Sequence, residues 1–186
     1  MGIESRYTDV STMGKQIVSN LEQDKYPLYL GKLVTNFHSL EFALRAFLWK
    51  EENATGITPS QSMNLDELNR GDIVPENAFT NYDTLEQLID KYNNNPIISK
   101  TDLMIDKTLL DIRDAIAHGR VSARTPSDSS KLLKFSRPKG KKVKVTHSIS
   151  MTKEWFNEQI KRTNKAARKV LKAIEASFPK GNEIFT

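Results

Sequence analysis

Apolar residues recur every three or four positions over residues 27–50, and this spacing predicts an amphipathic helix. The stripe is wide enough to require burial, and it consists of Leu30, Leu33, Val34, Phe37, Leu40, Leu44, Phe47 and Leu48. Pro27 suits the first helical turn, where its missing N–H has no helical partner. A shorter helix is predicted before it, over residues 12–23.

Residues 51–80 lose this periodicity, and proline and glycine residues interrupt them. One helical turn is predicted within them, near residues 65–68. A polar connection of this length inside a compact domain indicates an irregular insertion or a lid. A short amphipathic helix is predicted next, over residues 83–92.

The helix predicted over residues 102–117 carries two apolar stripes. Ile105, Leu109, Ile112 and Ile116 form one stripe, and Leu103, Leu110 and Ala117 form the other. Two stripes imply contact on two sides, as in a central helix or in one that also faces a second subunit. Gly119 is a natural stop signal for this helix.

Residues 131–149 change to an alternating period, which predicts a β-hairpin. Val143, Val145, His147 and Ile149 alternate with polar residues, and Leu133 and Phe135 alternate before them. A long amphipathic helix is predicted over residues 152–178. The predicted fold class is therefore all-α: a helical bundle with one small β-hairpin before the last helix, in a single domain over residues 1–186.

Composition points to a globular protein, because 38% of the 186 residues are hydrophobic and 27% are charged. There are no cysteines, which excludes disulfides and thiolate chemistry and agrees with a reducing compartment. The first nine residues lack the apolar core of a signal peptide, and no apolar run has the length that a bilayer requires. We therefore expect a cytoplasmic protein that does not enter a membrane.

Charge is divided unevenly along the chain. Residues 1–100 carry 9 Lys and Arg against 14 Asp and Glu, whereas residues 101–186 carry 19 against 9. This polarity is typical of a protein whose second half meets a polyanion, and equally of one with two solvated surfaces of opposite sign.

Seven positive charges and no acid fall within residues 131–144 of the predicted hairpin. Among them, Lys139, Lys141 and Lys142 are candidates to bind RNA phosphates in a salt-dependent manner. The alternative is a solvated strand edge, where lysines prevent strand-to-strand aggregation.

Arg113 is the unusual residue of the helix predicted over 102–117. Its neighbours three and four positions away are all apolar: Leu109, Leu110, Ile116 and Ala117. No carboxylate of the same helix therefore stands beside the guanidinium. Because an unpaired buried charge is strongly destabilising, we expect an acid from another helix or a phosphate. Glu41, within the apolar stripe of the first helix, is the candidate acid, and Arg45 four residues later is an alternative partner for Glu41.

Residues 113–120 read Arg-Asp-Ala-Ile-Ala-His-Gly-Arg. Arg113, four intervening residues and His118 resemble the Arg-x(4–6)-His motif of HEPN domains. Asp114 after the arginine and the glycine after the histidine resemble the same signature. The position of this motif late in a helix of a mostly helical chain adds to the resemblance.

Other parts of the chain resemble HEPN domains as well. Residues 40–45, Leu-Glu-Phe-Ala-Leu-Arg, are similar to an earlier helix of such domains. A hairpin followed by a long last helix is also found in that family. The resemblance covers residues 27–178, and residues 51–80 are the least family-like part.

The resemblance implies a HEPN-like fold and the activity of many members of that family. These are metal-independent endoribonucleases, often toxins or antiviral effectors, and they act as homodimers whose Arg and His residues line one cleft. Arg113 is then expected to hold the scissile phosphate, and His118 to act as general acid or base. Asp114 is expected to orient His118 or the backbone around it. The ribose 2′-hydroxyl is the expected nucleophile.

The helical geometry limits this prediction. Five residues along an ideal helix place Arg113 and His118 roughly 140° apart around its axis. Both side chains can then face one pocket only if the helix unwinds at Gly119 or if a second subunit completes the pocket. Arg120 and Arg124 follow closely enough to join the phosphate site.

A structural interpretation stands beside the catalytic one. His118 can bind the last carbonyls of its helix, and Arg113 can be a member of an ion pair. The function that the resemblance implies, and that we predict, is nevertheless an endoribonuclease without cofactor or metal. The three histidines lack metal-ligand spacing, which agrees with this expectation. RNA, a second copy and an antitoxin or other regulatory protein are the expected partners. The alternatives are a catalytically silent HEPN-like module that binds RNA, a nucleotide or a protein, and a helical scaffold subunit.

Overall fold

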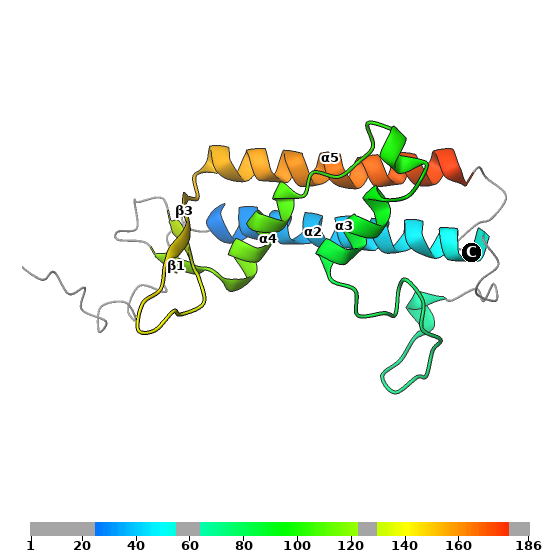
Figure 1. The fold of residues 1–186 in the computed structure, drawn as a ribbon, viewed down its shortest axis with the longest axis horizontal. Helices are drawn as coiled ribbons and strands as arrows, with labels where there is room; N and C mark the ends of the chain where they lie inside the picture. The colour runs from blue at the N-terminus through cyan, green and yellow to red at the C-terminus, as the bar shows by residue number, and fades with distance from the viewer. Residues whose placement is uncertain (1–24, 55–63, 123–129, 179–186) are drawn as a thin grey trace, which may run out of the picture.

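The computed structural model describes residues 25–54, 64–122 and 130–178 (Figure 1). This part of the chain contains four α-helices, two 3₁₀ turns and three strands. They are α2 (Lys25–Ala54), η1 (Leu65–Glu67), α3 (Leu85–Asn93), η2 (Ile98–Lys100), α4 (Thr108–His118), β1 (Arg120–Ser122), β2 (Lys131–Phe135), β3 (Val145–Ser150) and α5 (Lys153–Ser177). The helix predicted over 12–23 lies outside the described residues.

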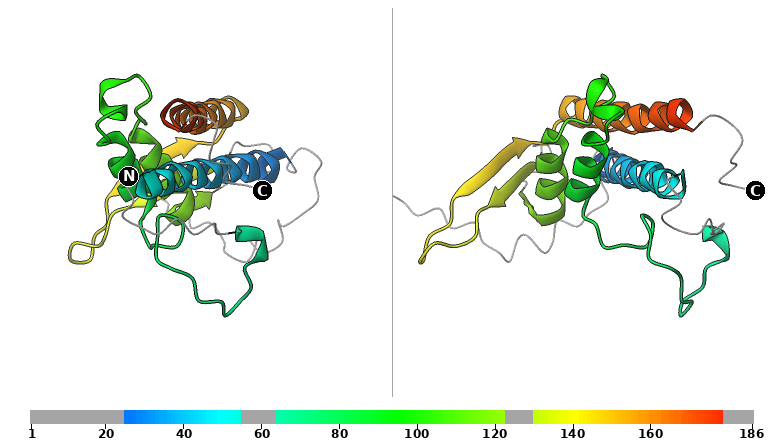
Figure 2. Two further views of the ribbon diagram at one scale, coloured as in Figure 1. Left: turned by 90° about the vertical axis from the view of Figure 1, so that its right-hand side faces the viewer. Right: turned by 45° about the vertical axis from the view of Figure 1, so that its right-hand side comes forward.

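The two longest helices, α2 and α5, lie side by side and run in the same direction (Figures 1 and 2). Near their starts, the ring of Tyr29 stacks on that of Phe156, with centroids 5.8 Å apart. Near their ends, Phe47 contacts Phe178, again with centroids 5.8 Å apart. Because parallel helices need a returning connection, the chain places α3, α4 and the sheet between them in sequence.

The hydrophobic core forms where α2, α3 and α5 meet. Its fully buried side chains include Leu33, Leu40, Leu44, Phe47, Leu88, Ile89, Tyr92, Phe156 and Val170. The rings of Phe47 and Tyr92 meet edge to face at 5.0 Å. Every position of the stripe predicted over residues 27–50 is buried or half-buried, so this prediction is confirmed.

The last helix also agrees with its prediction over residues 152–178. Thr152 caps it, because the side chain of Thr152 accepts a hydrogen bond from the backbone N of Trp155 at 3.1 Å. Leu171 on this helix is half exposed.

The helix predicted over 102–117 begins later, at Thr108. The side-chain amide of Asn93 binds both backbone groups of Ile105, donating to its O at 2.9 Å and accepting from its N at 2.8 Å. Asp106 then accepts a hydrogen bond from the backbone N of Thr108 at 2.9 Å. These bonds replace a helical ladder before residue 108, so the predicted start is wrong.

The hairpin predicted over 131–149 is present as β2 and β3, and β1 extends it to a three-stranded antiparallel sheet in the order β1-β2-β3. The fold class is therefore mostly helical with a small sheet instead of a hairpin alone. A strand of three residues is too short to show a period, which is why β1 was not predicted.

The connection between β2 and β3 projects from the helices as an exposed arm (Figure 2). Gly140 has a φ of +63° and takes the first central position of the turn, as a type II′ turn requires. All residues from 137 to 146 are exposed. Val143 and Val145, which alternate with polar residues in the sequence, are both about half exposed.

The irregular segment predicted over 51–80 is shorter than expected, because residues 51–54 complete α2. The 3₁₀ turn η1 confirms the helical turn predicted near residues 65–68. Of the described residues in this segment, Ala78 is buried against the core. Ala78 therefore fixes this segment to the bundle at one point, and its role as an irregular insertion or a lid stays a prediction.

Candidate functional site

The motif residues lie along the second half of α4. Leu109 and Ala115 anchor this helix and are 2% and 0% exposed. Arg113 instead has 45% of its side chain exposed, and His118, the last residue of α4, is also exposed. The expectation of a buried Arg113 is therefore wrong, because its long side chain carries the guanidinium past its apolar neighbours into solvent. Both motif side chains are accessible to a ligand.

Gly119 ends α4 for a steric reason. Its φ of −77° is one that any residue adopts. A Cβ at this position would lie 2.3 Å from the backbone O of Ala115 and 2.6 Å from Cδ1 of Leu132. The absent side chain lets β2 pack directly against the end of α4, and this contact brings the sheet to the motif.

Asp114 is surrounded by positive groups. Its Oδ2 accepts a hydrogen bond from Nζ of Lys134 at 2.9 Å, and its Oδ1 lies 3.5 Å from Nη1 of Arg113. The hydrogen bond from Lys134 lowers the pKa of Asp114, partial burial opposes this, and the charges of Lys134, His118 and Arg113 lower it further. We call these four residues the charge cluster. The hydrogen bond of Asp114 is to Lys134 of the sheet. That Asp114 orients His118 stays a prediction.

Lys134 was one of the seven positive charges counted in the predicted hairpin and was not singled out as a site residue, whereas the alternation pointed to Leu133 and Phe135. In the structure Leu132 is the buried residue of β2, with 2% exposure. Lys134 lies two residues further on the same face and reaches α4. His147 pairs with Lys134 across the sheet, and its Nδ1 is buried without a hydrogen-bond partner among the described residues. In the sequence, counting every second residue from Leu132 would have placed Lys134 on the face of β2 that packs against α4.

Arg120 starts β1 and pairs with Leu133, which neighbours Lys134 and therefore faces the other side of the sheet. Its guanidinium lies over the ring of Phe135, 5.3 Å from the centroid. The structure therefore engages Arg120 away from the charge cluster. Arg124 lies outside the described residues.

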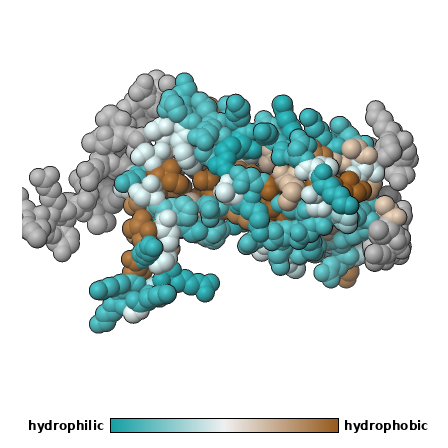
Figure 3. All heavy atoms as spheres, turned by 45° about the horizontal axis from the view of Figure 1, so that its top comes forward, coloured by the Kyte–Doolittle hydropathy of each residue, from teal (hydrophilic) through white to brown (hydrophobic). Residues whose placement is uncertain are grey.

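The hairpin-tip lysines, Lys139, Lys141 and Lys142, are exposed, and the tip of the arm is hydrophilic (Figure 3). Backbone hydrogen bonds between Lys139 and Lys142 close the turn. Lys134 lies within β2, at the foot of the same arm. Positive charges therefore stand at the tip of the arm and, with Lys134, at its foot beside α4.

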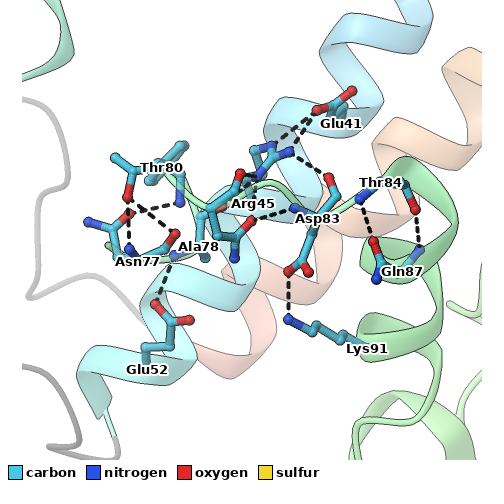
Figure 4. Close-up of polar contacts among 12 residues, drawn as sticks. Glu41, Arg45, Glu52, Asn77, Ala78, Thr80, Asp83, Thr84, Gln87 and Lys91 are labelled. Atoms are coloured by element: carbon cyan, nitrogen blue, oxygen red, sulfur yellow. Dashed lines mark hydrogen bonds and ion pairs between the residues drawn. The ribbon is translucent and has the colours of Figure 1, made fainter. Parts of the chain in front are cut away.

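Glu41 does not pair with Arg113. Its Oε1 lies 2.9 Å from Nη2 of Arg45, so the predicted support for Arg113 is wrong and the alternative partner four residues away is correct (Figure 4). The Arg45 side chain, 13% exposed, also donates to the backbone oxygens of Ala78, Asn81 and Asp83 at 2.8, 3.3 and 2.9 Å. Arg45 thus fastens residues 78–83 to α2, a role that the sequence pattern did not indicate.

Comparisons of the chain with protein-family models, curated proteins and solved structures each found no match. Across residues 25–54, 64–122 and 130–178, none of the helices combines the length and apolar character of a membrane span. In the same residues, His, Asp and Glu side chains do not gather in a group of three that suits a metal ion. Function is therefore inferred from the charge cluster and the basic arm.

Proposed function

We propose that this protein is a metal-independent endoribonuclease of the HEPN type that acts as a toxin or antiviral effector. The observation that carries this proposal is the exposure of Arg113 and His118 at the end of one helix, next to the basic arm. An accessible guanidinium, an accessible imidazole and a surface for phosphates are the groups that metal-free RNA cleavage uses.

The chemistry assigned to these residues is a transfer within the RNA strand. The imidazole takes the proton of the 2′-hydroxyl, whose oxygen attacks phosphorus as the bond to O5′ breaks. A second acid protonates O5′, so the products end in a 2′,3′-cyclic phosphate and a 5′-hydroxyl. Arg113 binds two oxygens of the phosphate and stabilises the charge that grows on them.

We further propose a homodimer that forms over α4. The half-buried side chains of Leu110, Ile112 and Ile116 keep part of their surface exposed on this helix. A second copy packed there would bury that apolar surface and supply the second imidazole. It would also place the arginine of one copy near the histidine of the other, which roughly 140° of ideal-helix rotation separates within one copy. A strict monomer at micromolar concentration would contradict this arrangement.

The decisive experiment incubates the purified protein with total RNA in the presence of a chelator. We expect cleavage to persist there and to fall at least about 100-fold in Arg113→Ala and in His118→Ala, because each removes a group that acts in the transition state. His38→Ala and Arg168→Ala are matched controls, since they remove the same residue types from exposed positions of α2 and α5.

The outcomes separate the alternatives. Cleavage that disappears with the chelator rejects the metal-free mechanism. A wild-type protein that binds RNA without cutting it favours the catalytically silent module, and one that does neither favours the scaffold subunit. Induced expression is expected to arrest growth only when both motif residues are intact.

The hairpin-tip lysines give a separate prediction about binding. Changing Lys139, Lys141 and Lys142 together to glutamine is expected to weaken RNA binding at physiological salt. The slope of log affinity against log salt should become less steep by about 2, the value for three phosphate contacts on a single strand. Filter binding at several salt concentrations measures this slope.

The matched control removes three positive charges from exposed positions of α5, at Lys161, Lys165 and Lys172. This variant has the same net charge as the hairpin-tip variant. Equal changes in the slope for both variants would show that overall charge, and not the arm, determines RNA affinity.

A further inference from the structure

Asp114 creates a difficulty for the phosphate site. Its Oδ1 lies 3.5 Å from the guanidinium of Arg113, and both side chains are nearly half exposed. A carboxylate and a phosphate compete for the same N–H groups of an arginine. Without another partner for Asp114, the Arg113–Asp114 pair would present a net charge of zero to RNA instead of the +1 of Arg113 alone.

The sheet provides the opposing charge. Nζ of Lys134 lies 2.9 Å from the other oxygen of Asp114, a closer contact than that of Arg113. We propose that Lys134 is a positioning residue of the RNA site: its ammonium occupies Asp114 and so leaves the Arg113 guanidinium available to a phosphate. This inference rests on the proposed function, and it adds a residue from the sheet to a site otherwise built on one helix.

The fold holds Lys134 in this position. It shares a face of β2 with the buried Leu132, and the close approach of Gly119 keeps that face against α4. Its side chain is 22% exposed, half as much as that of Asp114. Lys131, at the start of the same strand, lies on the other face and is exposed. Two lysines of one strand therefore have different environments, and the pair provides an internal control.

Two other roles for Lys134 make different predictions. If Lys134 binds the phosphate directly, replacing it lowers RNA affinity by the same factor whether or not residue 114 is charged. If Lys134 only stabilises the fold, replacing it changes the unfolding midpoint, and the size of its effect does not depend on whether Arg113 is present. The proposed role instead requires both the carboxylate of Asp114 and the guanidinium of Arg113.

A double-mutant cycle tests this role without requiring cleavage. The probe is an RNA oligonucleotide with 2′-O-methyl riboses, which lacks the nucleophile. Lys134→Met is expected to weaken its binding about tenfold in the wild-type background, the size of a coupled charge network. In the Asp114→Asn and Arg113→Met backgrounds, the same substitution should change affinity by less than about twofold.

Two controls accompany the cycle. Lys131→Met removes the same charge from β2 and should have the same effect in the wild-type and Asp114→Asn backgrounds. Lys134→Arg keeps the charge beside Asp114 and should retain wild-type affinity within about threefold. Thermal unfolding of each variant confirms that the compared proteins are folded.

The result that overturns the proposal is an equal loss for Lys134→Met in all backgrounds, or no loss in any. Failure of the proposed function looks different: the oligonucleotide binds and follows the cycle, but unmodified RNA is not cut. A wild-type protein that does not bind the oligonucleotide overturns both.

Discussion

Replacing Gly119 with alanine is expected to lower the free energy of unfolding by about 3 kcal/mol or more. The new Cβ would lie 2.3 Å from the backbone O of Ala115, and that oxygen is fixed because it accepts the hydrogen bond from the backbone N of Gly119 at 2.8 Å. Leu132 blocks the other side at 2.6 Å. The end of α4 and β2 must therefore move apart. Urea titration of the two proteins measures the difference.

Gly31→Ala is the matched control, because it makes the same chemical change within α2. No atom lies within 4 Å of a Cβ built at Gly31. Alanine is the better helix former, so this variant should be more stable than wild type by about 0.5–1 kcal/mol. Wild-type stability in Gly119→Ala would contradict the close contact between α4 and β2.

Arg45→Met is expected to cost about 3 kcal/mol, because it leaves several backbone acceptors and the partly exposed Glu41 without the mostly buried guanidinium. The substitution keeps an unbranched apolar stem but removes every donor to Glu41 and to the backbone oxygens of residues 78–83. These acceptors then lack their partner on α2. Chemical denaturation measures the overall loss, and faster amide hydrogen exchange in residues 78–83 would locate it.

Lys91→Met is a control that shows how much stability is lost when an exposed ion pair is removed, for comparison with the loss of the Arg45 contacts. Lys91 forms an ion pair with Asp83, a residue whose backbone oxygen also binds Arg45, but 54% of the Lys91 side chain is exposed. Its removal should cost less than about 1 kcal/mol. A similar small loss in Arg45→Met would mean that Arg45 does not hold residues 78–83 on α2.

Long helices with wide apolar stripes were predictable from the sequence. The helix expected over 27–50 is Lys25–Ala54, and the one expected over 152–178 is Lys153–Ser177. In both, the residues to be buried repeat along one face of a single segment, and a local period is enough to detect them. The capping hydroxyl of Thr152 marks the start of the second one.

Features that depend on distant partners were not predictable in this way. The late start of α4 follows from Asn93, whose amide binds the backbone of Ile105. The inward face of β2 follows from the approach of Leu132 to Gly119. Neither contact leaves a periodic signal, because each joins two elements through one or two side chains.

The same difference between local and distant contacts holds for the candidate site. Arg113, Asp114 and His118 were found together because they stand within six residues of one helix. Their partner Lys134 comes from a strand far along the chain, and the sequence showed it only as one of seven positive charges in the predicted hairpin. Glu41 was assigned to Arg113 on apolar surroundings alone, whereas its partner was the nearer Arg45.

The parallel course of α2 and α5 has an electrostatic consequence. Tyr26 near the start of α2 donates a hydrogen bond to Sδ of Met151, just before α5, so both helices begin at the sheet (Figure 1). Each helix macrodipole places about half a positive charge at its amino-terminal end. Antiparallel packing would cancel these contributions, but here they add at the end that bears the basic arm. Under the proposed function, the peptide groups at these two helix starts contribute to the attraction for RNA, and neutralising individual lysines does not remove that contribution.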